Sequence, residues 1–404
     1  MRDEQPSQRR HDGPIAAEAQ SRAIDALRGA AVVAVLEYHY GSLFKLYAWL
    51  GAPAAIRTPL AYGYAGVDLF FVLSAYLLTM SLVRIRANQA AGARKTAAFY
   101  VRRLFRIGPL YLVLLASAAV YEALASGRAE TPVALDRIAP LWRYMTFTQP
   151  YYLAQFPEWT GHYLAPTYSL AVEEHFYLVL PLLVVLLSRD ALKKLAILSL
   201  ALAPLIRLRL SIEIGDLAAI AWPIARIDSF GWGVLVALAA PQDKPALEKL
   251  RVGALAAALL AFGYVLAAQR FGLPYGHDVG EAALSSALAA LSCGVLMWVL
   301  DSAPGAGSLK PLVSALAWAG RRCFPIYLFQ MPVIFVIADL RGTGSPNVES
   351  AADAGFMLLA TIALLVLSDV THRLIERPAT EAGGALARRI LDGRRRVAMA
   401  SLRP

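Results

Sequence analysis

Ten long apolar blocks dominate this sequence and constrain what it can fold into. A membrane-spanning helix needs about 20 predominantly apolar residues. The blocks lie near residues 24–46, 61–83, 107–125, 165–187, 194–212, 217–240, 252–269, 281–300, 322–338 and 354–374. Composition agrees, because 58% of the 404 residues are hydrophobic and only 17% are charged, against about 25% charged in soluble domains. We therefore predict an all-α, polytopic membrane protein with about ten transmembrane helices.

Basic residues between the blocks predict how the chain is oriented. The net charge of +10 comes from clusters in the N-terminal tail, in segments 84–106 and 189–194, and near 388–396. Cytoplasmic loops carry an excess of Lys and Arg, so we expect both termini in the cytoplasm of a protein integral to the cytoplasmic membrane. This role explains the charge without nucleic-acid binding. The aromatic part of segment 126–164 is expected outside, as an interfacial or re-entrant stretch.

Three regions follow from this topology. Residues 1–20 are polar and are expected to form a disordered cytoplasmic tail. Residues 21–380 would form the membrane domain, and residues 381–404 a basic cytoplasmic tail. The two cysteines, Cys293 and Cys323, both lie in or beside apolar blocks. They exclude a disulfide scaffold and a cysteine-ligated zinc site, and no metal is expected.

Ionisable side chains inside the spans are the main functional signal, because they persist mostly where they face a bundle interior or a water-filled cavity. Arg28 and His39 are eleven positions apart in the first block. That spacing is about three helical turns, so both should lie on one face, about 16 Å apart along the axis. Snorkelling of Arg28 to headgroups and an interhelical hydrogen bond of His39 are the structural alternatives. Histidine is the side chain best suited to take a proton from a hydroxyl near neutral pH.

Four further charged residues are expected at about the depth of His39. Asp68 lies in the second block, Glu173 in the fourth, and Arg226 and Asp228 in the sixth. Because a buried charge needs a partner, an ion pair of Arg226 with Asp68 or with Glu173 is the structural alternative. The same pattern is typical of a pore or a reaction chamber. The spacing alone leaves both interpretations open.

Two arginines at the start of the third block suggest an anion site. Arg103 and Arg106 are three positions apart and therefore share a helix face at the expected cytoplasmic entrance. Guanidinium groups bind phosphate with paired hydrogen bonds. Ordinary anchoring at the cytoplasmic surface is the alternative.

Six short motifs in this order resemble the acyltransferase family 3 of integral-membrane acyltransferases. They are IDALRG at 24–29, GVDLFFVLS at 66–74, RLFRIGP at 103–109, YSLAVEE at 168–174, RID at 226–228 and IERP at 375–378. Arg28 and His39 also match the family's pattern of an arginine, ten residues and a histidine. The resemblance covers nearly the whole chain, from about Arg22 to Pro378.

The chain departs from the family pattern at three positions. Ala75 stands where the family often has glycine, and His175 where it often has glutamine. Gln330 stands where the family often has histidine. A glutamine does not titrate, but its amide can hydrogen-bond a substrate or His39. Some members carry a hydrolase-like domain after the membrane part, and here we expect the transferase to act alone or with a separate partner.

The resemblance implies transfer of an acyl group, usually acetyl, from cytoplasmic acyl-CoA to a hydroxyl of an envelope carbohydrate or a related acceptor. It leads us to expect acyl-CoA bound by Arg28, Arg103 and Arg106. His39 would be the general base or a transient acyl carrier. Glu173 or Asp68 would orient its ring and favour the charged imidazolium. Substrate binding is assigned to the remaining candidates, Arg226, Asp228, Gln330, Tyr168 and Ser169.

Two other classes compete with the enzyme. A proton-coupled transporter or exporter would use intramembrane histidine and carboxylates as a proton relay, but the motifs and the arginine pair favour the transferase. A membrane scaffold would not need so many buried charges. Trp142, Tyr144, Tyr151, Tyr152 and Trp159 could stack on sugar rings or anchor the protein at the interface. The sequence leaves the acceptor, the acyl group and the oligomeric state open.

Overall fold

A computed structural model describes residues 14–86, 92–125, 139–155, 163–239, 244–271, 276–301, 310–342 and 345–400. Within these ranges the chain forms helices and no strands. The elements are α1 (Pro14–Glu37), the π-helix η1 (Tyr38–Leu43), α2 (Leu46–Trp49), α3 (Ala54–Ala61), η2 (Gly63–Ala65), α4 (Gly66–Arg86), α5 (Gly92–Ala125), α6 (Leu141–Met145), α7 (Gln149–Leu153), α8 (Thr167–Leu186), α9 (Arg189–Glu213), α10 (Asp216–Ala221), η6 (Pro223–Arg226), α11 (Ile227–Leu238), α12 (Lys244–Phe271), α13 (Gly276–Asp301), α14 (Lys310–Arg321), α15 (Cys323–Leu340), α16 (Ala351–Thr371), η7 (His372–Glu376) and α17 (Arg377–Ala400).

The predicted all-α membrane fold is confirmed, and seven of the ten predicted spans meet a length and hydropathy criterion. In the described part of the chain, the qualifying segments lie within 54–83, 94–121, 167–186, 189–213, 279–301, 323–340 and 351–392. The other three predicted blocks are helical but fall outside this set. Two reasons are visible: α1 carries Asp25, Arg28 and Glu37, and α11 has only 12 residues.

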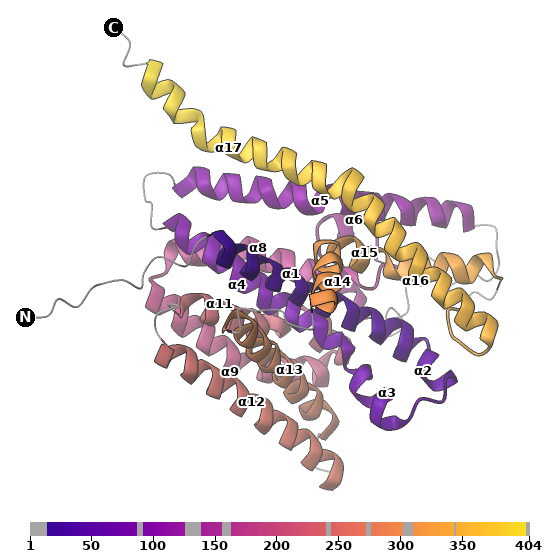
Figure 1. Cartoon of the computed structure of the whole chain (residues 1–404). Coiled ribbons are helices and arrows are strands. Elements are labelled where there is room, and N and C mark those ends of the chain that lie inside the picture. The colour runs from indigo at the N-terminus through magenta and orange to yellow at the C-terminus, as the bar shows by residue number, and fades with distance from the viewer. Residues whose placement is uncertain are drawn as a thin grey trace, which may run out of the picture.

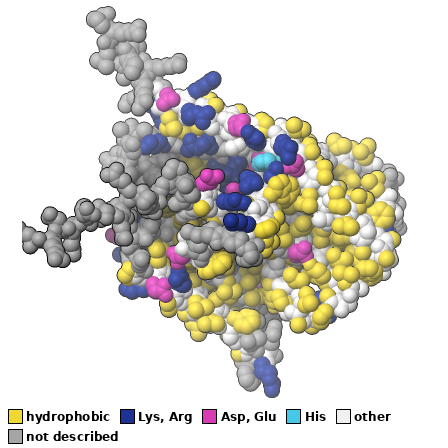
Figure 2. Space-filling model, in the orientation of Figure 1, with side chains coloured by type: hydrophobic (Ala, Val, Ile, Leu, Met, Phe, Trp, Pro, Cys, Tyr) yellow, Lys and Arg dark blue, Asp and Glu magenta, His cyan; other side chains and the backbone are white. Residues whose placement is uncertain are grey.

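The helices form one bundle in which most run side by side (Figure 1). The first residues of α1 and the last residues of α17 lie at the same end of the bundle in Figure 1. Figure 2 shows that Lys and Arg side chains gather toward that end of the visible face, whereas hydrophobic side chains cover most of the other half. This polarity agrees with the basic segments lying on one side of a membrane.

Glycines let α1 and α14 approach more closely than any side chain would allow. A Cβ on Gly29 would collide with the backbone carbonyl of Leu316, and one on Gly320 would collide with the carbonyl of Asp25. Small residues at helix interfaces permit such close backbone contact in membranes. The glycine that follows Arg28 therefore fixes α1 against α14, and Arg28 lies on the neighbouring face of the same helix turn.

Two segments outside the predicted spans, the aromatic segment and the C-terminal segment, contain helices. The aromatic segment that was predicted to lie outside forms the short helices α6 and α7, in which Tyr144 and Gln149 are buried. Residues 126–138 and 156–162, including Trp159, lie outside the described residues. Residues 381–400, in the predicted basic tail, belong to α17, which runs along α5 with Gly383 against Phe105. The yellow helix across the top of Figure 1 is α17.

Candidate active site

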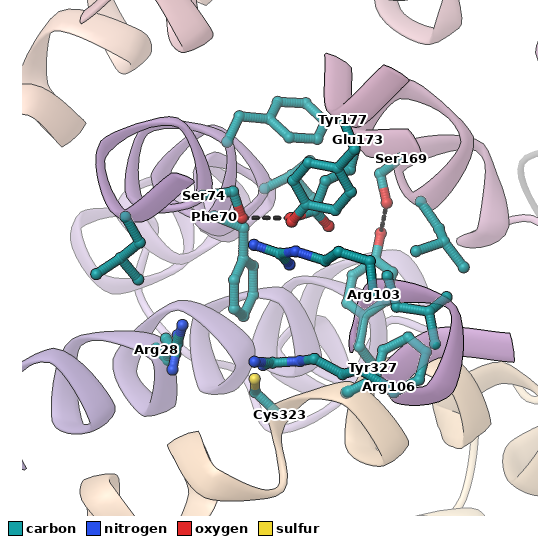
Figure 3. A pocket seen from close by; sticks show the side chains of 16 residues that line it. Arg28, Phe70, Ser74, Arg103, Arg106, Ser169, Glu173, Tyr177, Cys323 and Tyr327 are labelled. Atoms are coloured by element: carbon teal, nitrogen blue, oxygen red, sulfur yellow. Dashed lines mark hydrogen bonds between the residues drawn. The ribbon is translucent and has the colours of Figure 1, made fainter. Parts of the chain in front are cut away.

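A pocket opens where α1, α4, α5, α8 and α15 meet (Figure 3). It holds about 810 Å³ of empty space, part of which is open to solvent. Its polar lining includes three arginines, one carboxylate, hydroxyls and a thiol: Arg28, Arg103, Arg106, Glu173, Ser74, Ser169, Tyr177, Tyr327 and Cys323. Phe70, Phe71 and Phe324 contribute to the apolar lining. The five helices thus bring separate sequence motifs to one cavity.

The three arginines give this pocket an excess of positive charge. Arg103 and Arg106 extend from α5 into the pocket, and Arg28 faces them from α1 (Figure 3). The Arg103 guanidinium lies over the Tyr177 ring, with its central carbon 4.1 Å from the ring centroid. Within the described residues, neither Arg103 nor Arg106 forms an ion pair with a carboxylate, and Arg28 reaches Asp25 only at 3.5 Å. Because three arginines and one carboxylate line the pocket, its excess of positive charge suits an anionic ligand.

Glu173 is held at the other wall by two hydroxyls. Ser74 from α4 and Tyr177, one turn further along α8, both donate to its Oε1 atom; the bond from Ser74 is drawn in Figure 3. An acceptor with two donors on one oxygen has a fixed orientation and keeps its second oxygen for other contacts. The adjacent Glu174 points elsewhere, as expected for neighbouring residues on a helix.

His39 is not among the residues that line the pocket, and its ring is oriented by Gln330. The Gln330 amide nitrogen donates to the backbone carbonyl of Tyr327 at 3.1 Å. Its carbonyl oxygen lies 3.1 Å from His39 Nδ1. Because an amide oxygen only accepts, this contact requires the proton on Nδ1 and leaves the lone pair on Nε2. Gln330 itself is completely buried, and Tyr327 lines the pocket. Two contacts therefore link the imidazole to the pocket wall.

The structure does not give the carboxylates the orienting role that was expected of them. Glu173 is bonded to Ser74 and Tyr177. Asp68 pairs with Arg226 at 3.3 Å and accepts a hydrogen bond from Ser229 at 2.8 Å. This ion pair, one of the two structural alternatives, is buried and joins α4 to the start of α11. The side chain that accepts a hydrogen bond from His39 is instead that of Gln330, the position that departs from the family pattern.

The other predicted substrate residues are divided between the site and the scaffold. Ser169 lines the pocket, and its hydroxyl lies 2.6 Å from that of Tyr327. Tyr168 is its neighbour on α8 and is half-buried. Asp228 is instead bound on two oxygens by Arg207, at 3.0 and 2.6 Å. Both side chains of that pair are 2% exposed, so Asp228 lies in a buried ion pair and does not line the pocket.

Sequence reasoning missed several residues that the structure brings into these networks. Arg207 is one of two arginines inside the apolar block 194–212. The argument from charges inside spans that singled out Asp228 applies equally to Arg207. Tyr177 is four residues after Glu173, the spacing at which helix side chains meet. No sequence signal indicated that Ser74 and Tyr327 would reach the same cavity, because they come from separate helices.

Comparison with known proteins agrees with the family resemblance that the motifs indicate. The sequence model of an acyltransferase domain family, acyltransferase family 3, matches residues 21–373. The chain belongs to this family. It is 25% identical over 395 residues to the peptidoglycan O-acetyltransferase OatA of Listeria monocytogenes, covering 89% of this chain and 56% of that protein. It is also 25% identical over 391 residues to the putative peptidoglycan O-acetyltransferase YrhL of Bacillus subtilis, covering 89% and 55%.

A shorter similarity is found in Staphylococcus aureus. The putative O-acetyltransferase SACOL0978 is 31% identical over 169 residues, which is 41% of this chain and 24% of that protein. The chain thus spans just over half the length of OatA and YrhL. No solved structure matches it significantly.

Proposed function

We propose that this chain is a membrane O-acyltransferase that moves an acyl group, specifically acetyl, from cytoplasmic acyl-CoA to a hydroxyl of an envelope carbohydrate. The observation that carries the proposal is the pocket in which three arginines face a single carboxylate, Glu173. Its wall residue Tyr327 is linked through Gln330 to an oriented histidine, His39. Acyl-CoA carries several phosphate charges and a reactive thioester, so it fits both features. Membership of the acyltransferase family supports the same chemistry.

The donor would bind with its phosphates on Arg28, Arg103 and Arg106. Guanidinium groups form paired, charge-assisted hydrogen bonds to phosphate. Arg103 is restrained by stacking on Tyr177, so less side-chain freedom is lost when it binds an anion. The apolar side chains of Phe70 and Phe324 beyond the arginines would accommodate the uncharged arm of the coenzyme.

His39 would then act as the general base. Its Nε2 lone pair takes the proton from the acceptor hydroxyl while that oxygen attacks the thioester carbonyl carbon. The new carbon–oxygen bond forms, the carbon–sulfur bond breaks, and coenzyme A leaves as a thiolate that takes up a proton. The products are an acyl ester and the free thiol. The orientation set by Gln330 supports this role, because it presents Nε2 in basic form.

The acceptor proposal uses the names of the relatives. OatA and YrhL are named as acting, or putatively acting, on peptidoglycan, which is a polymer of N-acetylated sugars bearing hydroxyls. We infer a sugar hydroxyl as the acceptor, on the side of the membrane opposite the arginine pocket. In that arrangement the donor binds from the cytoplasm, and the acyl group crosses to the acceptor within the bundle.

Purified protein in lipid nanodiscs tests the proposal. With acetyl-CoA and peptidoglycan fragments or an N-acetylglucosamine tetramer, release of coenzyme A should accompany a mass increase of one acetyl group on the sugar. His39→Gln should abolish transfer but keep coenzyme A binding. Arg103→Ala should weaken that binding about tenfold or more, since it removes a charge-assisted contact.

A matched control is Arg209→Ala, because Arg209 is 74% exposed and pairs with Glu213 on the outside of α9. It should leave binding and transfer near wild type. Full transfer by His39→Gln would remove His39 from the chemistry. Movement of an unmodified sugar across proteoliposomes, without release of coenzyme A, would instead favour the transporter.

A further inference from the structure

A ladder of aromatic rings leads from the protein surface to His39. Tyr62 is 36% exposed, and its ring centroid lies 6.1 Å from that of Tyr64. The Tyr64 ring lies 5.4 Å from that of Tyr38, edge to face. The Tyr38 ring in turn lies 5.2 Å from the imidazole of His39. The four rings therefore form a continuous series that ends at the proposed base.

The hydroxyls of this ladder differ in their contacts from those of other tyrosines in the bundle. Within the described residues, those of Tyr38, Tyr62 and Tyr64 bond to no protein group. None of the three oxygens is a fully buried atom without a partner, so each keeps some exposed surface. Other tyrosines of the bundle behave differently: Tyr40 donates to the carbonyl of Gln330 at 2.9 Å, and Tyr111 donates to the carbonyl of Tyr144 at 3.1 Å.

Close backbone contact holds the ladder in place. A Cβ on Gly63, which separates Tyr62 from Tyr64, would collide with the carbonyl of Ala34 and lie 3.1 Å from the Cβ of Tyr38. Glycine is therefore required where η2 meets α1. The contact brings rings from the connection between α1 and α4 against the last turn before His39. The arginine pocket lies elsewhere, because none of these tyrosines lines it.

We propose that Tyr62, Tyr64 and Tyr38 form the acceptor track of the enzyme and bind a pyranose sugar ring. The apolar C–H face of a sugar stacks on an aromatic ring, while its hydroxyls exchange hydrogen bonds with phenol groups that the protein leaves available. The track guides one sugar hydroxyl to Nε2 of His39. This inference rests on the proposed acyl transfer to a sugar and adds to it the surface that binds the acceptor.

Steady-state kinetics on the full protein in nanodiscs test the track. The donor is acetyl-CoA, and the acceptors are an N-acetylglucosamine tetramer and, as a ringless alcohol, glycerol. Tyr64→Leu should raise KM for the tetramer about three- to tenfold, and the double variant Tyr62→Leu/Tyr64→Leu should raise it further. The kcat value, KM for acetyl-CoA and any transfer to glycerol should stay within about twofold of wild type. Tyr64→Phe keeps the aromatic ring and should therefore raise KM for the tetramer less than Tyr64→Leu does.

The control variant is Tyr264→Leu, because Tyr264 is half-buried on α12, away from the ladder. An unchanged KM for the tetramer in Tyr64→Leu and in Tyr62→Leu/Tyr64→Leu would overturn the track while leaving the proposed acyl transfer intact. The track would also be overturned if these variants lost kcat and acetyl-CoA affinity as strongly as they lost affinity for the tetramer. Such a general loss would indicate that the tyrosines serve packing. Transfer by the wild type to glycerol but to no sugar would refute the sugar class. Absence of acetyl-CoA turnover with every acceptor would refute the proposed function itself.

Discussion

Replacing Asp228 by asparagine is expected to destabilise the bundle strongly, because Asp228 balances the most deeply buried cation in the described structure. Arg207 is 1% exposed. It donates to both carboxylate oxygens of Asp228, and its other donors reach the carbonyls of Ala225 and Ala282 and the hydroxyl of Ser286. Asparagine keeps the shape but replaces one acceptor by an NH₂ donor that faces the guanidinium.

The size of the effect follows from these contacts. Removing one partner of a buried ion pair leaves an uncompensated charge and costs about 3–5 kcal/mol. Removing both charges, in Arg207→Met/Asp228→Leu, avoids that cost. Ser286 and the backbone N–H of Ser229 would still lose an acceptor on Asp228. The double variant should therefore lie only about 1–2 kcal/mol below wild type.

The assay is reversible unfolding in detergent micelles, combined with the acetyl-transfer assay. The single variant should unfold at markedly lower denaturant, and the double variant should recover most of the difference and retain transfer. A single variant as stable as wild type would refute the ion-pair reasoning, as would a double variant no more stable than the single one. A stable double variant with a raised acceptor KM would return Asp228 to substrate binding.

Two further predictions concern His39 and the α1–α14 contact. Gln330→Leu removes the acceptor for the Nδ1 proton of His39 and should lower the transfer rate about 10²-fold. Acetyl-CoA affinity, measured by calorimetry, should stay unchanged. An unchanged transfer rate would contradict the orienting role of Gln330. Gly320→Val would press a side chain against the carbonyl of Asp25 and should cost at least about 1–3 kcal/mol in unfolding experiments. Gly355→Val on α16, where the added atoms meet open space, is its control, and equal stability of the two variants would refute the close-packing argument.

The predictable part of this protein is the part that depends on local sequence. Apolar block length predicted the helices, because every backbone polar group in a bilayer must be satisfied within the structure. The three-residue spacing of Arg103 and Arg106 correctly predicted one shared face, since helix periodicity sets it. The number of spans was less certain: α1 carries charged residues and α11 is short, so neither meets a simple span criterion.

Contacts between helices were harder to predict, because residue spacing along one helix does not give its rotation against another. His39 was expected beside a carboxylate, yet Asp68 pairs with Arg226 and Gln330 takes the position beside the ring. Arg207 was overlooked although it binds Asp228. Each of these outcomes depends on which of several buried charges and amides come within hydrogen-bonding distance of one another.

The sequence by itself therefore determined the membrane setting, the helical class and the short list of intramembrane polar residues, because the cost of burying polar groups in lipid acts on every residue wherever the chain folds. Only the tertiary structure decided which of those residues face a cavity and which pair with each other. It left Arg28, Arg103 and Arg106 around open space and joined Arg207 to Asp228. The physical reason is that a buried charge must find either a partner or a ligand, and helix packing alone determines which of the two is within reach.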